Sequence, residues 1–153
     1  MRWLPVLTLL YFYGSASASP LRDQDPAVRW RAAYALSRSS DIMAAAELSA
    51  GTKDKNIWVR AFSLRALGKL KNQAPLEPLV SALADSEYLV RMEAVRALGL
   101  AGKADLLSAE IFRDPSAHVR AAAAGALAAT ENPALADKIL ALAGETSPLV
   151  RGE

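Results

Sequence analysis

Asp85 to Gly99 reads Asp-Ser-Glu-Tyr-Leu-Val-Arg-Met-Glu-Ala-Val-Arg-Ala-Leu-Gly, and similar stretches begin at Asp23, Asp54 and Asp114. The Val-Arg pair inside this stretch starts at positions 28, 59, 90, 119 and 150, with steps of 31, 31, 29 and 31 residues. A period of about 20–50 residues is typical of a solenoid, in which each repeat buries its apolar face on its neighbours. The sequence therefore predicts an array of about four repeats with a truncated fifth.

Each Val-Arg element has the periodicity of an amphipathic helix. Counted from its Val as position zero, apolar or small residues recur at +4, +5, +7 and +8, which lie on one side of a helix. We expect Gly68 and Gly99 to close two of these helices. Shorter stretches with helical spacing lie between them, at 42–50, 75–84, 104–112 and 133–143. The predicted fold is all-α, an α-solenoid of stacked antiparallel helix pairs.

A charged pair recurs in every copy, because an Asp precedes the Arg of the Val-Arg pair by six residues. The pairs are Asp23 with Arg29, Asp54 with Arg60, Asp85 with Arg91, and Asp114 with Arg120. These Arg side chains lie on the inward side of the helix, where an unpaired charge is costly. We expect each Asp to cap a helix N-terminus and to accept hydrogen bonds from an Arg of the same repeat or the next one. The pairs would then form a structural ladder along the solenoid.

This combination of Asp, Val-Arg and Ala-Leu-Gly resembles the HEAT repeat, in particular the short type named after phycobilin lyases. The resemblance covers residues 23–151 and rests on four near-complete copies. It implies a right-handed, curved stack of antiparallel helix pairs and, in most members of the family, a role in protein–protein interaction. It also implies that the Asp–Arg pairs are structural.

Residues 1–18 differ in composition from the rest of the chain. Arg2 is followed by an apolar run over 3–13, and positions 16–18 read Ala-Ser-Ala, which fits a signal-peptidase site. The run contains a proline and is shorter than the ~20 residues that span a bilayer. We expect a secretory signal peptide at 1–18, a repeat domain at 19–153, and a bacterial periplasmic or secreted protein with no stable membrane span after cleavage. An uncleaved anchor and a helix of a first repeat are the alternatives.

The residue composition leaves little for catalysis. The chain has no cysteine, which excludes disulfides, thiolate metal sites and a Cys nucleophile. Its single histidine, His118, excludes a His-based metal cluster and a Ser-His-Asp triad, and we assign this residue a packing role. The glycines are scattered rather than gathered in a phosphate-binding loop. We therefore predict neither an enzyme nor a cofactor or metal site.

The candidate interaction surface lies on the side of the Val-Arg helices opposite to their apolar columns. Positions +2, +3, +6 and +10 vary among the copies, and we expect them to point outward. Aromatic and Arg side chains, which are enriched where interfaces carry their binding energy, occur there in the first three copies. The candidate partner-binding residues are Trp30, Arg31, Tyr34, Phe62, Arg65, Met92 and Arg96.

Two of these arginines suggest the chemistry of the partner. Arg65 and Arg96 occupy the same column in adjacent repeats, so their guanidinium groups should project in parallel about 8–10 Å apart. This arrangement suits an acidic peptide or helix. Nucleic acid is not favoured, because the chain holds 18 Lys and Arg against 16 Asp and Glu.

We therefore interpret the chain as an exported protein-binding scaffold or adaptor. The alternative function is that of a subunit or chaperone-like factor for a cofactor-bearing protein, as in phycobilin lyases. Self-association through the open ends of the array is a further alternative.

Overall fold

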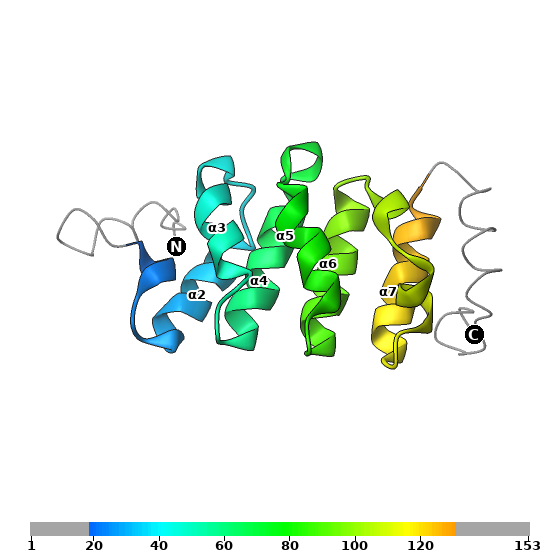
Figure 1. Ribbon diagram of the computed structural model, residues 1–153. Helices are drawn as coiled ribbons and strands as arrows, with labels where there is room; N and C mark the ends of the chain where they lie inside the picture. Colours follow the sequence, from blue (N-terminus) through cyan, green and yellow to red (C-terminus); the bar gives the residue numbers. More distant parts are fainter. Residues whose placement is uncertain (1–18, 131–153) are drawn as a thin grey trace, which may run out of the picture.

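The computed structural model describes residues 19–130, which form a stack of short helices (Figure 1). The elements follow one another along the stack in sequence order, from α2 near the blue end to α7 near the orange end. The predicted all-α fold is confirmed, because residues 19–130 contain no strand. The α-helices are α2 (Pro26–Leu36), α3 (Ala45–Gly51), α4 (Ile57–Gly68), α5 (Leu76–Ser81), α6 (Tyr88–Leu100) and α7 (Ala117–Ala128). The 3-10 helices are η1 (Pro20–Arg22), η2 (Ile42–Ala44), η3 (Lys71–Gln73), η4 (Ala82–Ala84), η5 (Ala104–Leu106) and η6 (Ala109–Arg113).

The four Val-Arg helices, α2, α4, α6 and α7, form one layer of the solenoid. Each makes its most extensive contacts with a neighbouring helix of this layer. The shorter elements form the second layer: α3 packs on α4, α5 and η4 pack on α6, and η6 packs on α7. The described residues are thus an α-solenoid of helix pairs.

The predicted apolar columns form the core of the stack. Val59, Val90 and Val119 are completely buried, and so are Leu67 and Leu98 in the +8 column. Burial of each such side chain stabilises the fold by about 1.5–3 kcal/mol relative to an exposed one. The equivalent residues of α2 are only partly buried, because α2 packs against one Val-Arg helix and not two within the described residues.

The third connecting segment departs from the prediction of a helix at 104–112. It forms the two 3-10 helices η5 and η6, with Leu107 in an extended conformation between them. The step in this repeat is 29 residues rather than 31. A 3-10 helix rises about 2.0 Å per residue against 1.5 Å for an α-helix, so fewer residues span the layer. Ile111 and Phe112 are still buried in the core.

Gly68 and Gly99 have a different role from the predicted one of closing a helix. They are the last residue of α4 and the penultimate residue of α6, so they lie at the C-terminal ends as predicted, but neither has the positive φ angle of a glycine that terminates a helix. A Cβ atom on Gly68 would lie 2.7 Å from the Cα atom of Ala97, and one on Gly99 would lie 2.8 Å from the Cβ atom of Ala126. These glycines therefore allow successive Val-Arg helices to approach closely.

Several predictions concern segments outside the described residues. These are the signal peptide at 1–18, the helix at 133–143 and the truncated fifth repeat.

Candidate interaction surface

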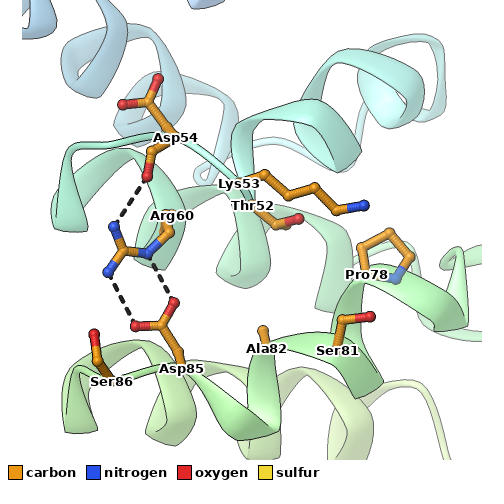
Figure 2. A pocket seen from close by; sticks show the side chains of 9 residues that line it. All are labelled: Thr52, Lys53, Asp54, Arg60, Pro78, Ser81, Ala82, Asp85 and Ser86. Carbon is orange, nitrogen blue, oxygen red and sulfur yellow. Dashed lines mark hydrogen bonds and ion pairs between the residues drawn. The ribbon is translucent and has the colours of Figure 1, made fainter.

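The recurring Asp and Arg side chains connect each repeat to the next. The carboxylates of Asp54, Asp85 and Asp114 each accept two hydrogen bonds from the Arg of the preceding repeat, through Nε and Nη2. The distances are 2.7 and 3.1 Å for Arg29 to Asp54, 2.8 and 2.9 Å for Arg60 to Asp85, and 2.7 and 2.9 Å for Arg91 to Asp114. Figure 2 shows one such pair, with Arg60 between Asp54 and Asp85.

Each of these arginines also stabilises the turn in its own repeat. Nη1 of Arg60 donates to the main-chain carbonyl of Asp54 (2.9 Å), and Nη1 of Arg91 donates to that of Asp85 (2.8 Å). The same contact joins Arg29 to Asp23 and Arg120 to Asp114. The prediction that the carboxylate accepts from an Arg of its own or the next repeat is therefore wrong in detail. The Arg of the same repeat binds the main chain, and that of the preceding repeat binds the side chain.

The Asp side chains hold the turn before each helix rather than cap the helix itself. The Asp54 carboxylate accepts the N–H of Asn56 (2.7 Å), and Asn56 is the N-cap of α4. The other three repeats have the same arrangement, with N-caps at Asp25, Glu87 and Ser116. The repeated Asp thus precedes the N-cap by two residues, which corrects the prediction that it is the cap.

Two of these carboxylates have perturbed acidity. Burial alone would raise the pKa of Asp54, but hydrogen bonds from Arg29 and the Asn56 N–H, together with the Arg29 charge, outweigh it and lower that pKa. The pKa of Asp114 is lowered in the same way, because burial is outweighed by hydrogen bonds from Arg91 and the Ser116 N–H. The folded state therefore favours the ionised form of both groups.

A polar hollow of about 380 Å³ lies beside the ladder (Figure 2). Its charged lining is balanced, because Arg60 binds Asp85 and the exposed Lys53 lies 3.8 Å from Glu77. The uncharged part of the lining comes mainly from the ends of α3 and α5. We interpret this hollow as a consequence of the ladder rather than as a binding site.

An aromatic cluster joins α2 to α4. Phe62 is at its centre, with ring centroids 6.4 Å from Trp30, 5.1 Å from Tyr34 and 6.1 Å from Trp58. Tyr34 and Trp58 keep 40% and 49% of their surface exposed. The cluster therefore packs two repeats together and still presents aromatic surface to solvent.

A three-membered ionic cluster joins α4 to α6. Glu93, which is only 2% exposed, accepts two hydrogen bonds from Arg65 (3.1 and 2.5 Å) and one from Arg96 (3.3 Å). Hydrogen bonds to Glu93 raise the pKa of Arg65 above its ordinary value. The two arginines therefore share one buried carboxylate, so they are not the independent pair that the sequence predicts.

The predicted outward columns are only partly exposed. Tyr34, Arg31 and Arg96 are exposed, whereas Ala61 and Met92 are buried and Trp30 and Phe62 are partly buried. The Val-Arg helices pack so closely that the buried members of the +2 and +3 columns lie between neighbouring helices, and the prediction that these columns point outward is wrong for those members.

Residues 45–109 match the family model of HEAT repeats. The match covers less than half of the chain, and over these residues the chain is similar to HEAT repeats. The matched segment runs from α3 to the beginning of η6. One further Val-Arg helix precedes it, α2, and another follows it, α7. HEAT repeats build helical scaffolds for protein interaction. No curated protein matches the chain in sequence.

The exposed side of the solenoid is strongly basic. We define the basic face as positions −1, +2, +3, +6 and +10 of the four Val-Arg helices. Its basic residues are Arg31, Arg38, Arg65, Lys69 and Arg96, and its only acidic residue is the buried Glu93. Two of these arginines lie over aromatic rings, Arg31 at 5.7 Å from Trp30 and Arg65 at 5.4 Å from Phe62. The basic face combines unbalanced positive charge with aromatic surface.

Three contributors to this face were not among the predicted binding residues. Trp58 is at position −1, the same column as His118, and the sequence assigns only a packing role to His118. Arg38 and Lys69 occupy the +10 column, where the guanidinium group of Arg38 lies 3.3 Å from the Tyr34 hydroxyl. The +10 column lies on the predicted outward side, so its basic residues were a signal for Arg38 and Lys69. The −1 column lies outside the predicted outward positions and gave no signal for Trp58.

Within 19–130, no three His, Cys, Asp or Glu side chains are placed to hold a metal ion. His118 stacks on Tyr88 with ring centroids 5.9 Å apart. No helix in the part of the chain that the structure describes is long and apolar enough to cross a membrane.

Proposed function

We propose that this HEAT array is a non-catalytic scaffold that binds an acidic protein segment on its basic face. The observation that carries the proposal is the charge of that face: five basic side chains share one surface with a single acid, and that acid is buried. Unbalanced charge of one sign steers and orients an oppositely charged partner. The exposed Tyr34 and Trp58 add the residue type that most often dominates binding energy.

The arginines that contact Glu93 are poor sites for testing this proposal. Arg65 and Arg96 neutralise a buried carboxylate, so Arg65→Glu with Arg96→Glu would leave three carboxylates together and destabilise the fold. Arg31, Arg38 and Lys69 are better suited. Their described contacts are with aromatic surface or solvent, and reversing them removes positive charge without creating a buried one.

The test is a binding experiment with two variants of equal charge change. One carries Arg31→Glu, Arg38→Glu and Lys69→Glu; the control carries Arg22→Glu, Lys55→Glu and Lys103→Glu, three exposed positions outside the basic face. Each immobilised protein is incubated with an extract of the native cell envelope, and captured proteins are quantified by mass spectrometry. We expect one acidic partner to be lost with the first variant only. Equal recovery, or equal loss, with the two variants would contradict the proposal.

Salt provides a second measurement of the same interaction. Because the Debye length falls from about 10 Å at 0.1 M salt to about 3 Å at 1 M, recovery of the partner should fall steeply over this range. Recovery that does not depend on salt would indicate an interface elsewhere on the array.

We also propose that the scaffold is exported. The support comes from the composition of residues 1–18 and the Ala-Ser-Ala sequence at 16–18. Intact-mass measurement of the native protein should give a chain that begins at Ser19. Recovery of a chain that retains Met1 in a soluble cytoplasmic fraction would contradict it. The assignment to the short phycobilin-lyase type of HEAT repeat stays a prediction.

A further inference from the structure

The basic face is hollowed between α6 and α7. The hollow has a volume of about 550 Å³ and is lined mainly by apolar atoms. Its walls include Met92, Arg96 and Leu100 from α6 and His118, Ala122 and Gly125 from α7. Leu100 is 53% exposed although it is a large aliphatic residue. This part of the array therefore presents apolar surface that no described residue covers.

The hollow lies where another helix pair of the same array holds a phenyl ring. In the α2–α4 pair, the +3 residue of the second helix is Phe62, and its ring fills the space between Trp30, Tyr34 and Trp58. In the α6–α7 pair, the +3 residue of the second helix is Ala122. Since the helices repeat the same packing, the missing ring leaves a space for a side chain of similar size.

The charges around the hollow favour an acidic ligand. Arg96 lines it, is 52% exposed, and shares the Glu93 carboxylate with Arg65, whose hydrogen bonds to that carboxylate are shorter. Glu93 is turned toward the α4–α6 contact and does not line the hollow. The guanidinium group of Arg96 therefore has donors left for a second carboxylate at the rim.

We propose that the hollow between α6 and α7 binds a bulky apolar side chain, of about the size of phenylalanine, from an acidic protein segment whose neighbouring carboxylate pairs with Arg96. The proposal rests on the proposed function and specifies the partner's chemistry. The apolar side chain supplies the burial that a purely electrostatic contact lacks, and the carboxylate orients it. The arrangement is that of an anchor residue in a pocket with a charged rim.

The array itself suggests the blocking variant. Ala122→Phe introduces the ring that Phe62 provides in the α2–α4 pair, and Ala122→Leu is a smaller filler in case the larger one unfolds the protein. Ala46→Phe is the matched control, because Ala46 is an exposed residue of α3 in the other layer. Thermal melting establishes which variants are folded.

The probe is a phage-displayed library of random 12-residue peptides, selected on the wild-type protein. We expect the enriched peptides to share a Phe, Trp or Leu within a few residues of Asp or Glu. Synthetic copies should bind at least about tenfold more weakly to Ala122→Phe or Ala122→Leu, as expected for loss of an anchor contact, and equally well to Ala46→Phe. Replacement of the peptide's apolar residue by Ala should cause a similar loss, and Arg96→Gln a smaller one.

The outcomes separate this inference from the proposed function. The enriched peptides could be acidic but lack an apolar anchor residue, bind Ala122→Phe normally, and fail to bind the variant reversed at Arg31, Arg38 and Lys69. That result would overturn the anchor-residue inference and support the proposed scaffold function. Peptides unaffected by both variants, or no enrichment at all, would contradict both. Sedimentation could also show that the wild-type protein self-associates and that Ala122→Phe does not. A second copy of the chain would then be the occupant of the hollow, and the inference would be overturned.

Discussion

Replacing Arg60 and Asp85 singly and together measures how strongly the ladder couples adjacent repeats. The pair is bidentate, at 2.8 and 2.9 Å, and its side chains are only 15% and 14% exposed. Loss of one partner of a fully buried pair costs about 3–5 kcal/mol, and residual exposure reduces this. Asp85→Ala also removes the acceptor for the Glu87 N–H (2.9 Å), a contact worth roughly 1 kcal/mol. We therefore expect Asp85→Ala to lower the free energy of unfolding by about 2–3 kcal/mol.

The coupling energy distinguishes the side-chain pair from the main-chain contact. Arg60→Ala and Asp85→Ala should be non-additive by about 1–2 kcal/mol, because both remove the same interaction. The matched control is Asp85 with Arg91. Arg91 donates to the main-chain carbonyl of Asp85, which survives Asp85→Ala, and its other donors bind Asp114. The coupling in this second cycle should be clearly smaller.

Urea denaturation followed by circular dichroism at 222 nm gives the free energies for both cycles. The slope of each transition must stay the same, because a change would signal that the array no longer unfolds as one unit. Equal coupling in the two cycles, or coupling below ~0.3 kcal/mol between Arg60 and Asp85, would refute the ladder as a link between repeats.

Three further predictions use the same measurement. Gly68→Ala should destabilise the array, because the new Cβ atom would collide with the backbone of α6. Gly125 is a helix-interior residue with open space around it, so Gly125→Ala should stabilise the array by about 1 kcal/mol. A Gly68→Ala protein more stable than the Gly125→Ala protein would contradict the role of Gly68 in close helix approach. Ser63→Ala should be neutral or stabilising by up to ~1 kcal/mol, because the buried Ser63 hydroxyl has no hydrogen-bond partner among residues 19–130; a clear loss of stability would show that the hydroxyl is satisfied. The pKa values of Asp54 and Asp114 are lower in the folded than in the unfolded chain, so the ionised carboxylates stabilise the folded state. This contribution to the free energy of unfolding is present above the unfolded pKa of about 4 and is lost as the pH falls through the folded pKa values. The urea midpoint should therefore drop on acidification, and Asp54→Asn with Asp114→Asn should flatten that drop; an unchanged profile would refute it.

The repeat architecture was determined by the sequence alone. The Val-Arg period, the apolar columns and the fixed Asp-to-Arg spacing predict an all-α solenoid, because a pattern repeated every 31 residues must bury the same face in each copy. The burial of Val59, Val90 and Val119 follows directly from it. Local patterns of this kind report which side of a helix is apolar, and that information lies within a dozen residues.

The interaction surface was decided only by the tertiary structure. The sequence places Arg65, Glu93 and Arg96 on one variable face of the helices, but not the buried carboxylate that both arginines share. Likewise, Ala122 is one small residue among many until its position in the repeat is compared with that of Phe62. The physical reason is that exposure on this face depends on the distance between neighbouring helices, which Gly68 and Gly99 make short. A helical wheel describes the directions of side chains around one axis, whereas grooves and shared charges arise between two axes.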